Sequence, residues 1–248
     1  MSSTTETGHV KNVANLETMI TILNSFGSSY NPSREAIQRP ALAALLQESD
    51  SSVKAVNALF PAYSNGVAAR EVAFEPLSKL TTRVVNSLKA TDTSSQVDDS
   101  AVTIARKIKG IRATAKLTDD EKKTLADAGQ TVKEISSSQL SFDSRLDNLD
   151  KLIQLLDVTP QYAPNEEELK VETLKALYTD LKAKNMAVVS AAAPLTAARI
   201  HRNEILYKPL TGLVDITFDV KTYVKSVFGA SSPQYKQLSA LEFKAVKS

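Results

Sequence analysis

Residues 42–74 read LAALLQESDSSVKAVNALFPAYSNGVAAREVAF, and this stretch decides the fold class. From Leu42 to Phe74, ten positions follow one another at alternating spacings of four and three, and all but Ser49 and Arg70 are apolar or aromatic, as in a helix that shows one narrow side to a partner. We call these residues the 42–74 seam: Leu42, Leu46, Val53, Val56, Phe60, Tyr63, Val67 and Phe74. No segment sustains the alternation of polar and apolar residues that is typical of a strand. The sequence therefore predicts an all-α protein with a long helix whose seam faces a partner.

Two blocks of sequence recur at the same offset. Residues 71–80 (EVAFEPLSKL) and 204–213 (EILYKPLTGL) share four of ten positions at an offset of 133. Residues 15–23 (NLETMITIL) and 148–156 (NLDKLIQLL) share four of nine positions at that offset. Two separate blocks with a common offset predict an internal duplication.

The duplication predicts the domain organisation. We expect a first helical repeat at 9–113, a linker at 114–140 and a second repeat at 141–245. Each repeat carries a Glu five residues before a shared Pro, which gives the repeat signature Glu71, Pro76, Glu204 and Pro209. Because proline removes a backbone donor and kinks or breaks a helix, we expect long, proline-kinked helices. The repeats are expected to pack about a pseudo-twofold axis as one elongated bundle, and two independent bundles are the alternative.

Local signals predict several helix starts. Asn31-Pro32 offers a cap followed by proline at the first helical position, and so does Ser232-Pro233. Asn165 with Glu168 has the spacing of a capping box. Residues 212–228 are rich in β-branched residues, but their apolar positions recur at three and four, so a helix is expected there as well.

Composition excludes several classes of protein. The chain of 248 residues has 30 Lys+Arg against 28 Asp+Glu, no Cys, 2 His and only 7 Gly. A net charge of +2 gives the whole molecule no drive toward nucleic acid or anionic lipid. The uncharged run 185–198 is shorter than the roughly 20 residues that span a bilayer. The N-terminal residues are polar and lack the apolar core of a secretory signal, so we expect a cytoplasmic protein without a transmembrane segment.

Candidate catalytic and metal-binding residues are few. The sequence contains no nucleophile elbow, P-loop, dinucleotide fingerprint or HExxH motif, so we expect no enzyme, cofactor or metal. His201 and Glu204 have the spacing of a di-metal bundle, but the position that matches His201 is Ala68, and both histidines are expected at the surface. Glu71 and Glu204 either form a symmetric carboxylate pair, or each pairs with a neighbouring arginine (Arg70, Arg202) or caps the helix that follows the proline.

One segment is strongly basic. Residues 104–116 (IARKIKGIRATAK) carry no acid and contain the candidate anion contacts Arg106, Lys107, Lys109, Arg112 and Lys116. Such a segment can dock on phosphates or an anionic membrane surface. It has no aromatic residue for base stacking and acidic residues flank it on both sides, which favours a solvated helix face.

Several segments of the sequence resemble those of a known group of proteins. The segments that carry the resemblance are GHVKNVANLE, VAAREVAFEPLSKL, SRLDNLDKLI, YAPNEEELK, LYTDLKAKN and SPQYKQL. They are similar to those of bacterial helical proteins of about this length that are duplicated in the same way and have no assigned function. The resemblance covers nearly the whole chain and implies an all-α fold. It carries no catalytic motif, so no site residue is transferred.

These observations favour a non-enzymatic structural or protein-interaction protein. We expect it to associate with itself, or with a helical protein partner, through the long 42–74 seam. A nucleic-acid- or ribosome-associated protein that uses residues 106–116 is the alternative, with nucleic acid less favoured as a partner. A helical protein that inserts into membranes through residues 185–198 is a weaker alternative.

Overall fold

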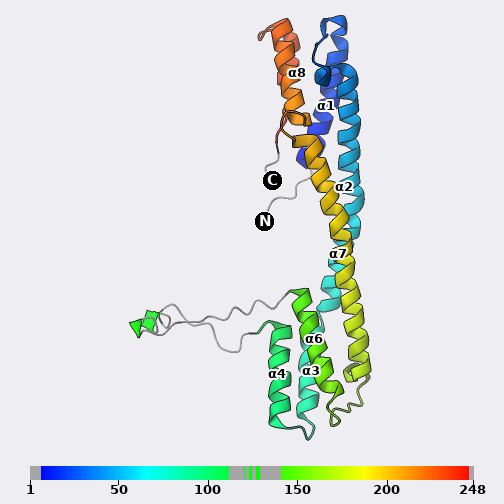
Figure 1. Cartoon of the computed structure of the whole chain (residues 1–248), viewed down its shortest axis with the longest axis vertical. Coiled ribbons are helices and arrows are strands. Elements are labelled where there is room, and N and C mark those ends of the chain that lie inside the picture. The colour runs from blue at the N-terminus through cyan, green and yellow to red at the C-terminus, as the bar shows by residue number, and fades with distance from the viewer. Residues whose placement is uncertain (1–6, 112–119, 121–122, 125–126, 129–140, 246–248) are drawn as a thin grey trace. The chain divides into compact units, whose positions relative to one another are not determined.

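The computed structural model describes residues 7–111, 120, 123–124, 127–128 and 141–245 (Figure 1). Within these residues every regular element is a helix and no strand occurs, so the all-α prediction is confirmed. The expected linker at 114–140 falls almost entirely outside the described residues. None of the described helices is long and apolar enough to cross a membrane.

Two helices are much longer than the rest. These are α2 (Arg39–Phe74) and α7 (Val171–Tyr207), with 36 and 37 residues. The other α-helices are α1 (Thr7–Ser25), α3 (Leu77–Lys89), α4 (Ser95–Lys109), α6 (Phe142–Asp157), α8 (Leu213–Phe228) and α9 (Pro233–Ser239). Short 3-10 helices at Gly27–Ser29, Glu35–Ile37 and Glu167–Leu169 lie in the connections before the long helices.

The prolines act in two different ways. Helices α2 and α7 continue through Pro61 and Pro194, so the chain does not break there. Pro76 directly precedes α3, and Pro209 lies between α7 and α8, so helices do end near these two prolines as expected. A missing N–H costs least at such a boundary, where the first helical N–H groups have no intrahelical partner in any case.

The α7–α8 connection requires its glycine. The N–H of Gly212 donates to the carbonyl of Lys208 at 2.7 Å. A Cβ at this position would lie 2.6 Å from the Lys208 backbone nitrogen, closer than any side chain can come. Leu210 in the same turn has a φ of 68°, and its N–H donates to Asp215 Oδ2 at 2.8 Å. The turn therefore depends on Gly212 and on a local carboxylate acceptor.

Two predicted helix starts are wrong and one is confirmed. Helix α2 begins at Arg39 rather than at Pro32, and α7 begins at Val171 rather than after Asn165. In each case a buried tyrosine explains why the helix begins at a later residue. Tyr30 Oη donates to Ile37 O at 2.5 Å, and Tyr162 Oη donates to Leu169 O at 2.7 Å, so the intervening residues form a turn and a 3-10 helix.

At α9 the expected cap is present. Ser232 precedes the helix and its Oγ accepts a hydrogen bond from the N–H of Tyr235 at 3.1 Å. Helix α6 has the same kind of cap from Ser141, which accepts from the N–H of Ser144. Residues 213–228 form helix α8, as their spacing predicts.

The chain divides into two compact units. Unit 1 comprises Met1–Tyr63 with Ala191–Ser248, and unit 2 comprises Ser64–Ser190. Each unit therefore includes part of both long helices, and each takes helices from both of the predicted repeats.

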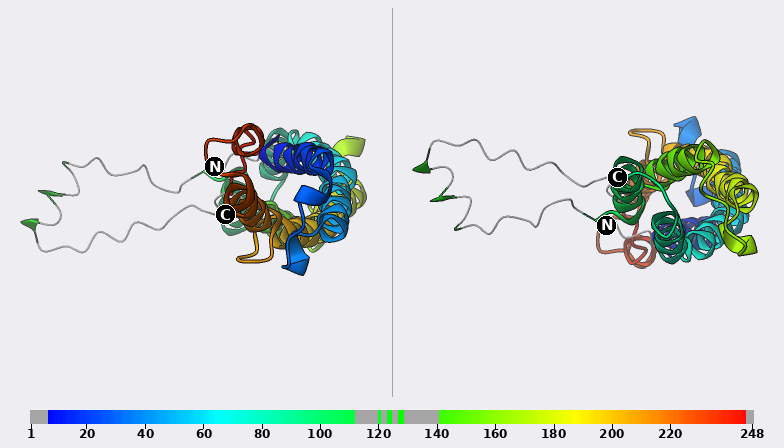
Figure 2. Two further views of the ribbon diagram at one scale, coloured as in Figure 1. Left: turned by 90° about the horizontal axis from the view of Figure 1, so that it is seen from above. Right: turned by 90° about the horizontal axis from the view of Figure 1, so that it is seen from below.

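Unit 1 has its own hydrophobic core. Leu16, Met19 and Leu23 of α1 lie in one buried cluster with Leu213 and Val220 of α8. Helices α1, α8 and α9 pack on one another, and Figure 2 (left) looks along their axes. Burial of each large aliphatic side chain contributes about 1.5–3 kcal/mol, so α1 depends on α8 for much of its stability.

The C-terminal residues of unit 1 are tied to the other helices by hydrogen bonds. The Asn12 side chain donates to Lys244 O at 2.9 Å and accepts from Lys244 N at 3.2 Å, as a neighbouring strand would. Lys221 Nζ donates to Leu241 O at 2.5 Å. Phe243 is buried between these anchors, at 7% exposure.

Unit 2 has a second, separate core. Helix α4 packs on α3 and on α6. Buried side chains from all three helices, among them Leu88, Ile108 and Leu152, form one cluster with Leu174 and Leu181 of α7. Leu174 and Leu181 of α7 point into this core, so the opposite side of the helix in unit 2 faces away from it.

Candidate interaction surface

The chain itself covers most of the 42–74 seam. Leu42 and Val53 lie in the core of unit 1, Phe74 lies in the core of unit 2, and Val56 is 1% exposed. Leu46, Tyr63 and Val67 are half-buried. Among the eight seam residues only Phe60 is exposed, at 46%. The seam is therefore mainly internal packing surface, and Phe60 is the member that a partner can reach.

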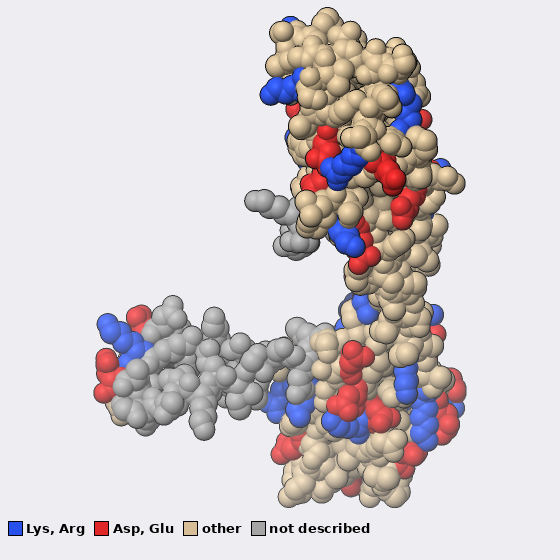
Figure 3. Space-filling model, turned by 45° about the horizontal axis from the view of Figure 1, so that its top comes forward, with Lys and Arg blue, Asp and Glu red and all other residues tan. Residues whose placement is uncertain are grey.

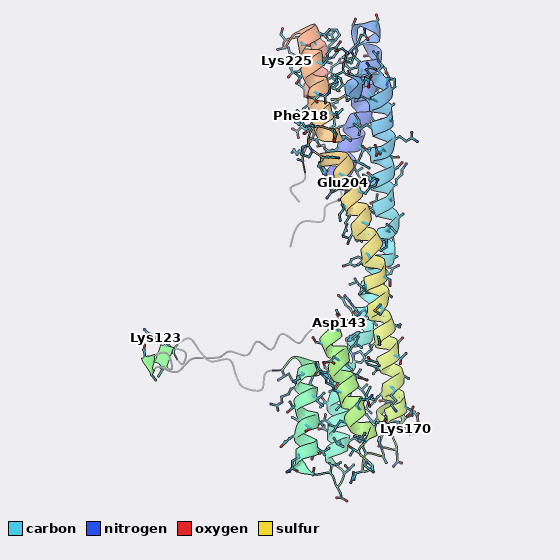
Figure 4. The ribbon with its side chains drawn as sticks, viewed as in Figure 1. Lys123, Asp143, Lys170, Glu204, Phe218 and Lys225 are labelled. Atoms are coloured by element: carbon cyan, nitrogen blue, oxygen red, sulfur yellow. The ribbon has the colours of Figure 1, made fainter. Side chains whose placement is uncertain are left out.

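A cluster of arginines and aromatic rings occurs at the end of α2 in unit 2. The guanidinium carbon of Arg70 lies 3.9 Å from the centre of the Phe142 ring, and Nη1 donates to Asn185 Oδ1 at 3.0 Å. Asn185 Nδ2 donates in turn to Asp143 Oδ1 at 2.7 Å; Asp143 is labelled at the start of α6 in Figure 4. The chain of contacts joins α2, α6 and α7, and each cation–π contact contributes about 0.5–2 kcal/mol.

The same cluster contains a second contact between an arginine and an aromatic ring. Phe142 meets Phe74 edge to face, with ring centres 4.8 Å apart. Arg145 lies 5.2 Å above the Phe74 ring and donates to Phe74 O at 3.1 Å, and burial lowers the pKa of Arg145 from its ordinary value. A guanidinium neither takes up nor releases a proton near neutral pH. These residues are therefore suited to holding helices together and not to acid–base chemistry.

In unit 1 a histidine of α1 and a tyrosine of α7 are in contact. His9 is only 5% exposed, and its Nδ1 lies 2.6 Å from Tyr207 Oη. The two rings are 5.6 Å apart, and Asn12 Nδ2 lies 3.4 Å from the same hydroxyl. The expectation that His9 lies at the surface is wrong, because Tyr207, 198 positions later in the sequence, packs against it. His201, by contrast, is exposed as expected.

The repeat-signature residues lie at the ends of the long helices. Glu71 belongs to unit 2 and Glu204 to unit 1, and both side chains are exposed. Their carbonyls accept the final hydrogen bonds before the connections, from Glu75 N and Lys208 N, each at 3.1 Å. Among the described residues no group of three or more His, Asp or Glu side chains could hold a metal ion.

The basic segment is only partly within the described residues. Arg112 and Lys116 lie outside them, whereas Arg106, Lys107 and Lys109 form the last turn of α4. Lys107 is exposed, and Arg106 donates to Thr103 Oγ1 at 3.3 Å. Basic residues in a last helical turn stabilise the helix dipole by about 0.3–1 kcal/mol each. On the face drawn in Figure 3, basic and acidic side chains are intermixed.

One side of α7 was missed by sequence reasoning. Met186, Val189 and Ile200 are exposed at 52%, 53% and 57%. The uncharged run 185–198 is the signal that could have found this side. The run also contains buried residues, Val188 and Leu195, so its outward side becomes clear only when the inward side is known.

Comparison with known proteins assigns no relative. No protein-family model matches the chain, and no curated protein or solved structure is significantly similar to it. This outcome agrees with a resemblance to helical proteins of no assigned function.

Proposed function

We propose that the chain is a non-enzymatic structural or protein-interaction protein that associates with itself through its long helices. The observation that carries the proposal is the exposure of large apolar side chains on α2 and α7, namely Phe60, Met186, Val189 and Ile200. Single exposed apolar residues are common, but a succession along one helix marks an interaction surface.

The charge distribution supports the same function. No charged residue occurs in 55–69 of α2 or in 185–198 of α7. A surface without charges can be buried against another protein with no cost of removing ions from water. A helical partner or a second copy is therefore favoured over a highly charged ligand.

An internal duplication is part of the proposal. Both long helices follow a turn in which a buried tyrosine bonds to a carbonyl seven residues later. The ring pairs Phe74–Phe142 and His9–Tyr207 also occupy matched positions, since 142 and 207 lie 133 residues beyond 9 and 74. These contacts support descent from one repeated unit.

Light scattering on the size-exclusion peak tests self-association directly. We expect a mass that is a multiple of 26.9 kDa, with a 260/280 nm absorbance ratio typical of protein alone. A monomer at all concentrations would contradict self-association. A raised ratio that nuclease or salt removes would favour instead a nucleic-acid-binding role for Arg106, Lys107 and Lys109. Binding to liposomes that persists at high salt would favour the membrane alternative.

A further inference from the structure

Helix α1 of unit 1 holds a short stretch of non-helical chain by its backbone. This stretch, which we call the 241–245 segment, follows α9. Asn15 Nδ2 donates to Glu242 O at 2.7 Å. Asn12, one turn earlier on α1, donates to Lys244 O at 2.9 Å and accepts from Lys244 N at 3.2 Å. The segment is therefore fixed to α1 at two successive points.

Helix α8 holds the same segment. Lys221 Nζ donates to Leu241 O and lies 5.2 Å from the centre of the Phe243 ring. Phe243 is 7% exposed and belongs to the core of unit 1. The same Nζ lies 5.7 Å from the ring of Phe218, which is labelled in Figure 4 and is 51% exposed. Lys221 therefore lies between the seated segment and an aromatic side chain that a ligand can reach.

The hydrogen bonds to the segment recognise its backbone. Within the described residues, four bonds reach it from α1 and α8, and all of them end on main-chain atoms. Every residue except proline offers the same N–H and C=O groups, so these bonds suit extended chains of many sequences. In sites of this kind the main-chain bonds provide affinity and side-chain pockets provide specificity. We call Asn12, Asn15 and Lys221, with the buried surface under Phe243, the α1–α8 site.

Unit 2 has a longer helix at the place that corresponds under the proposed duplication. The helix that follows α3 is α4, which has 15 residues and three buried side chains. The helix that follows α8 is α9, which has 7 residues and buries Leu238. Beyond the end of α9, the 241–245 segment buries Phe243. Because the free energy of burial grows with the apolar area removed from water, the segment leaves its site at a lower cost than α4 would.

The residues of the segment indicate the ligand that the site prefers. Leu241 packs against the core of unit 1, and Phe243 is buried in it. Burial lowers the pKa of Lys221 from its ordinary value, and the charge of Glu242 acts in the opposite direction. An acidic residue at this point therefore offsets part of the cost of holding a partly buried ammonium group. The preferred order is an aliphatic, an acidic and an aromatic residue.

We propose that the α1–α8 site binds an extended peptide of a partner protein, with an aliphatic, an acidic and an aromatic residue in that order. The 241–245 segment is the resident competitor for this site. A tethered segment acts at an effective concentration of millimolar order, so a free peptide binds well only when the segment is weakened or released. This inference goes beyond the proposed self-association and does not depend on it.

Peptide binding to full-chain variants tests the site. The probe is a fluorescein-labelled peptide of residues 239–245, SALEFKA, followed by fluorescence anisotropy. Phe243→Ala weakens the resident segment and leaves the site intact, so we expect it to bind the probe about tenfold more tightly than the wild type, or better. Lys244→Ala is the matched control and is expected to resemble the wild type, because its side chain is 79% exposed. The peptide SALEAKA, which lacks the aromatic ring, is expected not to bind.

Substitutions on α1 locate the binding. In the Phe243→Ala background, Asn15→Ala removes a bond to the peptide backbone and is expected to weaken probe binding several-fold. Asn24→Ala is the matched control, because Asn24 is an exposed residue in the last turn of the same helix. Equal effects of the two substitutions would overturn the assignment of the peptide to the α1–α8 site.

A milder variant keeps the test decisive if Phe243→Ala unfolds, which circular dichroism shows. Leu241→Ala removes a half-buried side chain and is expected to give a smaller gain in probe binding. A folded variant of either kind that binds the probe no better than the wild type would overturn the proposal, and so would equal binding of SALEFKA and SALEAKA. Light scattering on the same samples separates the two proposals, because a monomer that binds the probe contradicts self-association alone.

Discussion

A Cβ placed on Gly66 would lie 3.5 Å from Cγ2 of Val188, at ordinary van der Waals distance. Gly66 is an interior residue of α2 and is half-buried against α7. The glycine therefore brings the two long helices close together, but it leaves room for one methyl group. This contact distinguishes Gly66 from Gly212, where an added Cβ collides with backbone atoms.

We expect Gly66→Ala to stabilise the protein by about 0.4–1 kcal/mol, because alanine lowers the entropy of the unfolded chain and favours the helix. The measurement is the free energy of unfolding in urea. Gly212→Ala is the contrasting variant and is expected to destabilise. A loss of stability in Gly66→Ala would show that α2 and α7 are closer than a methyl group allows.

Tyr162→Phe removes the hydroxyl that donates to Leu169 O. The carbonyl loses a buried hydrogen bond, and we expect a loss of about 1–2 kcal/mol in the free energy of unfolding. Tyr63→Phe is the matched control, because Tyr63 is half-buried within α2 and its hydroxyl makes no hydrogen bond to the described residues. Equal effects of the two substitutions would mean that the turn does not depend on the Tyr162 bond.

The same tyrosine predicts a response to alkaline pH. Burial raises the pKa of Tyr162 from 10.0 to about 12, with the Glu166 charge acting in the same direction. Between pH 10 and 12 the folded state keeps a proton that the unfolded state has lost. The contribution of Tyr162 to the free energy of unfolding is therefore fully present below pH 10 and decreases as the pH rises toward 12. We expect Tyr162 to contribute about 2–3 kcal/mol of this decrease, and Tyr162→Phe to show a correspondingly shallower decline in urea titrations.

The Arg70–Phe142 contact can be measured by a double-mutant cycle. We expect Arg70→Ala with Phe142→Leu to give a coupling free energy of about 0.5–2 kcal/mol. Arg70→Lys is the intermediate case, since an ammonium cannot lie flat on the ring. Additive effects in the cycle would mean that Arg70 stabilises the protein through Asn185 alone.

The topology predicts how fragments behave. Unit 1 needs α1 from the first part of the chain and α8 from the last. Fragments 1–111 and 141–248, produced separately, are therefore expected to show little cooperative unfolding. Produced together, they should associate and recover the circular dichroism and cooperative melting of the whole chain. A cooperative transition in either isolated fragment would contradict this dependence.

Sequence reasoning predicted the helices better than their beginnings. The 4-3 periodicity of residues 42–74 predicted α2, because such a pattern depends only on neighbours along the helix, whereas a second long helix was expected from the duplication. Asn31 and Asn165 looked like caps, yet the bonds of Tyr30 and Tyr162 hold the following residues in turns. No local signal distinguishes a capping asparagine from one in such a turn.

The surface was harder to predict than the helices. The burial of Leu42, Val53, Val56 and Phe74 requires partners from distant parts of the chain, which a periodic pattern does not identify. His9 was expected at the surface for the same reason, since Tyr207 lies 198 positions away. The composition of α7 indicated an uncharged run, but only the burial of Val188 reveals that Met186 and Val189 face outward.

Unit 1 combines the first and the last parts of the chain, and this has a consequence for synthesis on the ribosome. Unit 2 is a continuous stretch of chain and can fold as soon as residue 190 has emerged. Helix α1 must wait for α8, which begins at Leu213. At ordinary elongation rates that wait is about 10–40 s. During this time Leu16, Met19 and Leu23 are exposed to other nascent chains, and an early chaperone contact with α1 would protect the growing polypeptide from aggregation.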